Sequence, residues 1–317
     1  MADLFINTFL SVSNGIIKIF IIAFIAGLLV WKKILNHDHI DALSKITVYV
    51  FLPCLIFSTI FSGFKPEELP IWWTIPLGVI LFTLAGTGFC ALLFLRKLRS
   101  VRAILALGSM QNAAYLALPI GEFVYKSQFN QFAVYCFLVV LGISPVLWTV
   151  GFILVTNKTW SELKIKDLFT PPLIANIFAI LIVLTGAKRF VPGFLADTFE
   201  FMGKATVPAA TLILGATLAT VYNNLPRWDE SLKILFVKFV VMPVSVILFV
   251  HFTGLKDNYP LLSEVLVIQA ATAPATAFII QVRTYGGDLK RIGGHIFISY
   301  FVTLIAIPFW LSVCKLF

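Results

Sequence analysis

The sequence predicts an all-α integral membrane protein with ten transmembrane helices, arranged as a 5+5 inverted repeat whose fourth and ninth helices are broken and cross. Three observations predict this fold class. Of the 317 residues, 60% are hydrophobic and 12% are charged, with a mean hydropathy of +0.97, whereas soluble domains are about half apolar and about a quarter charged. Apolar runs recur along the whole chain. Two of these runs hold a proline among polar residues.

Each apolar run has about the length that a membrane crossing requires, because about 20 helical residues span about 30 Å of hydrocarbon. The ten runs lie at residues 16–30, 40–61, 71–95, 103–123, 132–155, 172–187, 205–222, 232–253, 261–282 and 293–316. Because these runs recur along the whole chain, we expect no separate soluble domain.

The basic residues of the loops orient these helices. Lys32 and Lys33 follow the first run, and Arg96, Lys97 and Arg99 follow the third. Because basic loops remain on the cytoplasmic side, we expect a multi-pass protein of a bacterial inner (plasma) membrane with both termini outside. The net charge of +9 then reflects orientation and attraction to anionic lipid headgroups. We therefore expect membrane lipids, and not nucleic acid, as partners.

A polar stretch from Thr156 to Pro171 divides the chain into two halves. We predict a first five-helix repeat over 1–156, a cytoplasmic linker over 157–170 and a second five-helix repeat over 171–317. Because five is odd, the second half enters the membrane from the opposite side, which is the topology of an inverted repeat. Short sequence echoes occur in the same order in both halves, such as KITV with KATV and SPVLW with IPFW.

The fourth run contains the stretch GSMQNAAYLALPIG, from Gly108 to Gly121. Pro119 removes a backbone donor and clashes with the carbonyl of Tyr115, so the helix should kink or break there. The ninth run holds Pro274 in a similar setting. Backbone groups freed at membrane depth must be satisfied inside the protein or in a cavity, so both prolines should face the interior.

Two broken helices near the bilayer midplane resemble the substrate site of a secondary transporter. Each break creates a helix N-terminus with free N–H groups and a positive partial charge, which attracts anions. Polar side chains flank both breaks: Ser109, Gln111, Asn112, Gln269, Thr272 and Thr276. The alternative is that these residues only join helices to each other, since prolines and small polar side chains also occur in ordinary transmembrane packing.

At these residues the sequence resembles the auxin efflux carrier family, which includes plant PIN proteins and bacterial carboxylate carriers and is related in fold to bile acid symporters. The similarity covers essentially the whole chain. Its most specific parts are Asn112 to Pro119, FLPCLIFSTI at Phe51 to Ile60, LGATLA at Leu214 to Ala219 and RTYGGD at Arg283 to Asp288.

The resemblance implies a ten-helix inverted repeat in which the fourth and ninth helices cross at their prolines. It implies that the first, second, sixth and seventh helices form a scaffold and a homodimer surface, while the others form a mobile transport domain. Asn112 falls at the position of the family's substrate-binding asparagine. Gln111, the alanines around Pro274 and Tyr49, where plant members have a lysine, depart from the family pattern. These departures favour a small aliphatic carboxylate over an aromatic, auxin-like substrate.

Ionisable residues inside the runs are candidates for coupling or charge compensation, because a charge at the bilayer centre is costly. Glu264 precedes Gln269, and Glu122 follows Pro119; either could carry a proton, and the alternative is a carboxylate at a helix end. Lys238 lies inside the eighth run and Lys204 begins the seventh; either could neutralise an anion.

The combined expectation is a secondary active transporter, or uniporter, of small organic anions such as malate, malonate or lactate, working by elevator-like alternating access. Protons rank above sodium as the coupling ion, because the alanine-rich ninth run offers few oxygen ligands. The alternatives are a sodium-coupled, bile-acid-like symporter and a transport-inactive sensor on the same fold. No lipase or metalloprotease motif occurs, so we expect no enzyme activity, no cofactor and no metal.

Overall fold

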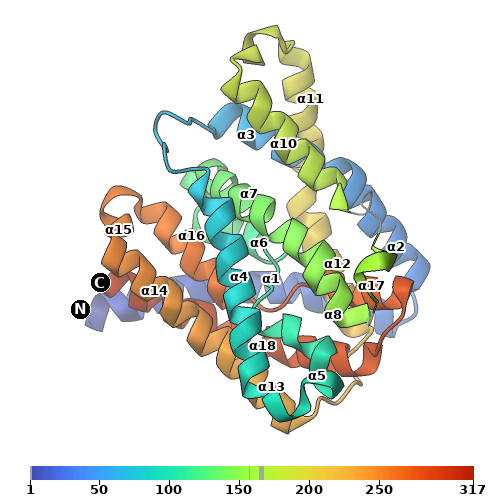
Figure 1. Ribbon diagram of the computed structural model, residues 1–317. Coiled ribbons are helices and arrows are strands. Elements are labelled where there is room, and N and C mark those ends of the chain that lie inside the picture. The colour runs from blue at the N-terminus through green and yellow to red at the C-terminus, as the bar shows by residue number, and fades with distance from the viewer. Residues whose placement is uncertain (1, 157, 164–167) are drawn as a thin grey trace.

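The computed structural model describes residues 2–156, 158–163 and 168–317. The described residues form helices and no β-strand, in agreement with the predicted all-α class. The N- and C-terminal ends lie next to each other (Figure 1). The predicted linker over 157–170 falls partly on residues 157 and 164–167, which lie outside the described residues.

The first half of the chain contains five helical segments, of which the second and fifth continue through π turns and the fourth is interrupted after a 3₁₀ turn. Their bounds are α1 Ala2–Trp31; α2 His37–Ile46, a π turn Thr47–Phe51 and α3 Leu52–Gly63; α4 Thr74–Leu93; α5 Leu98–Leu105, a 3₁₀ turn Ala106–Gly108 and α6 Ala117–Val124; and α7 Phe129–Val146, a π turn Leu147–Gly151 and α8 Phe152–Thr156.

The second half continues in the same way. Its bounds are α10 Pro171–Leu184; α11 Gly193–Gly203 and α12 Thr206–Ala219; α13 Trp228–Phe236, a π turn Val237–Val241 and α14 Met242–Thr253; α15 Leu255–Asn258; α16 Pro260–Ala271 and α17 Ala277–Tyr285; and α18 Leu289–Leu316.

Seven helices among the described residues are long and apolar enough to cross a membrane. The chain is therefore a multi-pass membrane protein, but three of the ten predicted crossings differ from a single long helix. The sixth crossing corresponds to α10, which has only 14 residues. The predicted fourth and ninth runs are each interrupted, and α16, with 12 residues, is the first part of the ninth. By contrast, α1 begins at Ala2, well before the run predicted at 16–30.

The π turns lie beside prolines. Pro243 follows the turn Val237–Val241, and a proline removes the hydrogen bond to the carbonyl four residues earlier, here that of Phe239. The indole Nε1 of Trp310 in α18 donates to this Phe239 carbonyl at 2.7 Å. The helical defect is thus satisfied by a neighbouring helix, as membrane depth requires.

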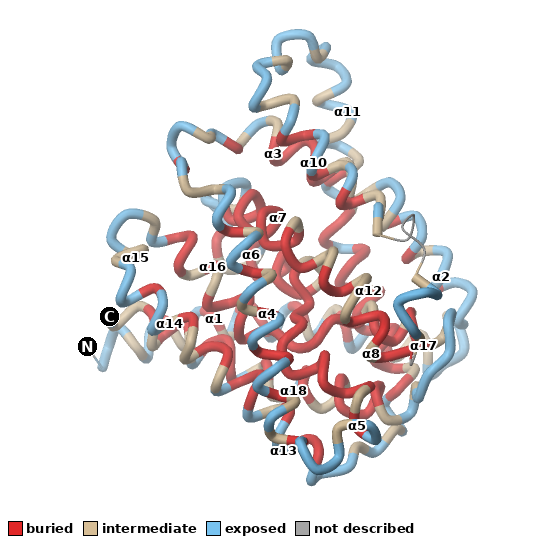
Figure 2. Tube along the Cα trace, in the orientation of Figure 1, coloured by how far each residue is buried: buried red, intermediate tan, exposed pale blue. Residues whose placement is uncertain are grey.

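The buried residues gather in the centre of the molecule, around α6, α7, α16 and α18 (Figure 2). α10 and α11 project from this centre together with part of α3 (Figure 1), and both contact α3. Their exposed apolar side chains include Phe178, Phe194 and Phe201. Such exposure is ordinary for helices immersed in lipid, where apolar side chains meet an apolar solvent.

Close helix contact between α1 and α12 depends on Gly215. A Cβ atom at this position would lie 2.1 Å from the carbonyl oxygen of Ala23. Small residues permit this kind of backbone approach between membrane helices.

Gly215→Ala is expected to lower the free energy of unfolding by about 1–3 kcal/mol, because the backbone of α1 must move away. Thermal unfolding of the purified protein in detergent measures this effect. Gly78→Ala is the matched control, because a Cβ at Gly78 meets no atom within 4 Å, and it should leave stability unchanged or slightly higher. Equal stability of the two variants would contradict the close α1–α12 contact.

Candidate functional site

The two interrupted helices meet at their breaks. Gln111 and Pro274 form an isolated antiparallel bridge. The N–H of Asn112 donates to the carbonyl of Ala273 at 2.9 Å, and the N–H of Ala275 donates to the carbonyl of Met110 at 3.1 Å. Each non-helical segment therefore supplies the backbone partners that the other lost on leaving its helix, which is the condition for irregular backbone inside a membrane.

Asn112 ties this crossing to a third helix. Its side-chain amide donates to the hydroxyl of Tyr300 in α18 at 2.7 Å and to Thr276 Oγ1 at 3.3 Å. Its side-chain oxygen accepts from the N–H of Tyr115 at 3.1 Å. Asparagine often holds a turn through such a local bond, which competes with the helix. The Asn112 side chain thus helps to keep the fourth segment open and is itself almost fully buried, at 6% exposed.

Gln269 joins the crossing from the end of α16. Its side-chain amide donates to the carbonyl of Ala113 at 3.0 Å. Its side-chain oxygen is buried and has no hydrogen-bond partner among the described residues. A buried polar atom without a partner is costly in a protein interior, so this oxygen is available to a donor from a ligand or a water molecule.

The remaining polar candidates have local partners. Ser109 and Thr87 of α4 share a hydrogen bond of 2.7 Å between their hydroxyls. The hydroxyl of Thr272 donates to the carbonyl of Gln269 at 2.9 Å. Gln111 lines a largely apolar cavity of about 620 Å³ between α4, α14 and α16.

The two prolines are both buried but occupy different places. Pro274 lies at the crossing, whereas Pro119 lies in the first turn of α6, beyond it. The expectation that both helices cross at their prolines is therefore wrong for Pro119. A proline is tolerated in the first helical turn because its missing N–H would have no partner there. The break itself begins earlier, directly after Gly108.

The breaks leave four helix ends at the crossing. The 3₁₀ turn Ala106–Gly108 and α16 end there, and α6 and α17 begin there. The beginning of a helix carries a positive partial charge and its end carries a negative one. The positive end of α6 therefore lies at the crossing. From there α6 packs against α1 and α12.

The ionisable candidates do not gather at the crossing. Glu264 accepts a hydrogen bond from the Tyr125 hydroxyl and lies 3.4 Å from Lys315 Nζ, beside a separate cavity of about 580 Å³. Glu122 is exposed. Lys204 is exposed and pairs with Glu200 at 2.9 Å, so the structure does not bring it to the crossing. Lys238 differs from the other three in being fully buried, in the π turn Val237–Val241.

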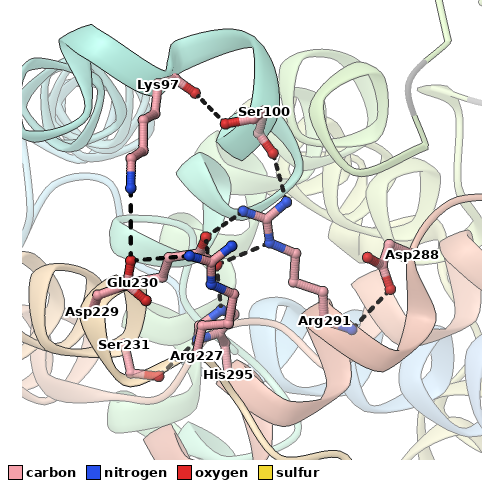
Figure 3. A network of polar contacts seen from close by, with 9 residues as sticks. All are labelled: Lys97, Ser100, Arg227, Asp229, Glu230, Ser231, Asp288, Arg291 and His295. Atoms are coloured by element: carbon pink, nitrogen blue, oxygen red, sulfur yellow. Dashed lines mark hydrogen bonds and ion pairs between the residues drawn. The ribbon is translucent and has the colours of Figure 1, made fainter.

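A buried ionic cluster that the sequence did not single out joins α13, α18 and α5 (Figure 3). Glu230 of α13 is 2% exposed, and both its carboxylate oxygens accept from Arg291 of α18, at 2.5 and 2.9 Å. His295 lies 3.3 Å from the same carboxylate and 2.9 Å from the hydroxyl of Ser231. Arg291 also donates to the carbonyl of Ser100 in α5. The cluster therefore fastens α13 and α18 to the helix that leads into the crossing.

Glu230→Ala is expected to lower the free energy of unfolding by about 3 kcal/mol, because removing one partner of a buried ion pair leaves the other charge uncompensated. Thermal unfolding in detergent measures the loss. Glu200→Ala, which removes an exposed ion pair, should change little. If the two variants unfolded at the same temperature, the cluster would not stabilise the protein.

Two groups of residues at these sites escaped the sequence reasoning. Tyr300 contacts Asn112 but lies in a long helix without any break. A signal existed, since Ser299, Tyr300 and Thr303 place polar groups on consecutive turns of an apolar run. Glu230 and Arg291 lie just before the predicted runs 232–253 and 293–316, where charged residues are ordinary.

Comparison with known proteins adds a family to this geometry. The family model described as "Membrane transport protein" matches residues 11–166 and 158–311. An uncharacterized transporter of Methanocaldococcus jannaschii is 25% identical over 287 residues, which cover 87% of this chain and 90% of that protein. Protein PIN-LIKES 3 of Arabidopsis thaliana is 22% identical over 377 residues, which cover 96% of this chain and 97% of that protein.

Proposed function

Because the chain belongs to the auxin efflux carrier family of membrane transport proteins, we propose that it is a secondary carrier or uniporter that moves small organic anions across its membrane. The observation that supports this proposal best is the crossing itself. Two interrupted helices exchange backbone hydrogen bonds there, and the buried Asn112 side chain lies between them and α18. Such crossings place helix ends and polar groups where a substrate can bind.

The bound anion is a carboxylate in this proposal. The first turns of α6 and α17 offer positive partial charge at the breaks, and Asn112 offers amide N–H groups. Gln111, Gln269, Ser109, Thr272 and Thr276 complete the polar surroundings. Pro274 interrupts the ninth helix at the crossing, and Pro119 lies beyond it in the first turn of α6. These hydrogen-bond donors are few and uncharged. We therefore expect the site to bind a small aliphatic acid, such as malate, malonate or lactate, better than a large aromatic acid.

The mechanism we propose is an elevator-like movement within a ten-helix inverted repeat. In this arrangement α5–α6 and α16–α17 are the fourth and ninth helices, and α10 is a short sixth helix. α1, α2–α3, α10 and α11–α12 form the scaffold and a homodimer surface, and the remaining helices move with the substrate. Adjacent N- and C-terminal ends (Figure 1) are compatible with an even number of crossings, with both termini outside an inner (plasma) membrane.

Uptake of radiolabelled L-malate into proteoliposomes tests the proposal, with unlabelled malonate, lactate and an aromatic acid as competitors. Saturable uptake, reduced by the small acids and not by the aromatic acid, would support an organic anion carrier. Saturable binding without flux would instead favour a transport-inactive sensor. The absence of both binding and flux with all these acids, from protein that unfolds cooperatively, would overturn the proposed substrate class.

A further inference from the structure

Lys238 is a buried amine without a partner. Its side chain is 0% exposed, and its Nζ has no hydrogen-bond partner among the described residues. Nor does it take part in any ion pair there. An ionised side chain in this setting is costly unless it is compensated. An ionisable residue inside a membrane span is therefore a candidate for function.

Lys238 lies on an element that contacts two of the segments that end at the crossing. The π turn Val237–Val241 contacts the 3₁₀ turn Ala106–Gly108, α4, α16 and α18. Two of these elements, Ala106–Gly108 and α16, end at the breaks, so their carbonyl ends carry negative partial charge. Helix ends of this kind stabilise a cation, and no other basic residue of the π turn is available.

The neighbouring elements supply no carboxylate that pairs with Lys238. The titratable and charged groups on these elements and on the flanking α13 and α14 are Cys90, Asp229, Glu230, Lys233, His251, Glu264, Lys290, Arg291, His295, Tyr300, Cys314 and Lys315. The two glutamates on these elements already have partners: Glu230 is held by Arg291, and Glu264 by Tyr125 and Lys315. Two buried oxygens without partners, Thr83 Oγ1 on α4 and Gln269 Oε1 on α16, lie on elements that contact the π turn. Each is a buried acceptor that no group among the described residues satisfies.

We propose that Lys238 is the proton-binding group that couples the carrier, and that the negative ends of the two half-helices stabilise its ammonium form. This inference rests on the proposed carrier function. A proton from water binds to the Nζ lone pair as the carboxylate enters, so the site gains one positive and one negative charge together. The proton returns to water on the opposite side when the carboxylate leaves. On entry, hydronium gives up the proton, so one O–H bond breaks as the N–H bond forms; on release the N–H bond breaks and a water molecule takes the proton as hydronium.

The first test measures L-malate uptake into proteoliposomes with a pH gradient or a sodium gradient imposed alone. In the wild-type protein, the pH gradient should accelerate uptake and the sodium gradient should not. Lys238→Met should lose the acceleration by the pH gradient, because no proton can then bind at this position. Lys233→Met, an exposed neighbour on the same segment, should behave as wild type. Persistent pH-driven uptake in Lys238→Met, or sodium-driven uptake in wild type, would overturn the inference.

The second test does not require a substrate. Solid-state NMR of the full chain, labelled with ¹⁵N-lysine in liposomes, distinguishes ammonium from amine nitrogens, and the resonance that is missing in Lys238→Met belongs to Lys238. We expect this resonance to move from the ammonium to the amine position within the pH range over which the protein stays folded. A resonance that keeps one position throughout would overturn the proposal. If Lys238→Met does not fold, Lys238→Arg provides the assignment, and its permanent charge should equally abolish acceleration by the pH gradient.

The two tests separate the two proposals. If no acid is transported but Lys238 titrates, the substrate class is wrong and the proton site stands. If malate is transported but Lys238 keeps one charge state, the carrier function stands and the coupling inference fails.

Discussion

Replacing Asn112 with alanine is expected to abolish or strongly reduce saturable uptake of L-malate. The side-chain amide lies at the crossing, 2.7 Å from the Tyr300 hydroxyl, where its N–H groups can also bind a carboxylate. A hydrogen bond to a charged group contributes about 1.5–3 kcal/mol, so its loss should weaken substrate binding by about 10- to 150-fold. Uptake kinetics in proteoliposomes measure this change.

The alanine variant also removes the acceptor for the N–H of Tyr115, so a second variant separates binding from folding. Asn112→Asp keeps that acceptor and the shape of the side chain but places a negative charge beside the substrate, and it should lose uptake equally. Asn130→Ala is the control, because this exposed amide bonds only Ser62 in the described part of the chain. Unchanged uptake in both Asn112 variants would remove this residue from the site.

A disulfide between α1 and α6 is expected to stop transport by locking the proposed scaffold to the proposed moving domain. A Cβ at Gly15 of α1 would lie 2.7 Å from a Cγ of Val124 in α6, which is close enough for a disulfide after replacement of both residues by cysteine. Oxidation of the double variant Gly15→Cys/Val124→Cys should abolish uptake, and a reducing agent should restore it. Replacing the half-buried Cys54 with serine beforehand removes a competing thiol.

The matched control links two helices of the proposed scaffold. A Cβ at Gly27 of α1 would lie 3.5 Å from the Cβ of Ala219 in α12, again within the range of a disulfide. Oxidised Gly27→Cys/Ala219→Cys should transport as well as its reduced form. Full activity of the oxidised Gly15–Val124 protein would contradict movement of α6 against α1, and loss of activity in the control would contradict α1 and α12 as one rigid unit.

The membrane class and the positions of most helices follow from the sequence alone. The bilayer imposes a nearly fixed length on a crossing helix, so apolar runs predict α4, α7–α8, α13–α14 and α18 without knowledge of their neighbours. The two interruptions also have local signals, since a proline and several small polar side chains occur in each of the runs that contain them. The exact place of the crossing has no such signal, because Pro119 follows the break and lies in the first turn of α6.

Which polar residues meet was decided by the tertiary structure. Lys204 and Lys238 look alike in the sequence, each a lysine in or at the edge of an apolar run, yet one is exposed beside Glu200 and the other is fully buried. The direction in which a helical side chain points depends on how its helix is rotated against its neighbours, and packing sets that rotation. For the same reason, the sequence alone predicted Asn112 as a site residue, but only the folded chain brought Tyr300 to it and joined Glu230 to Arg291 across 61 residues.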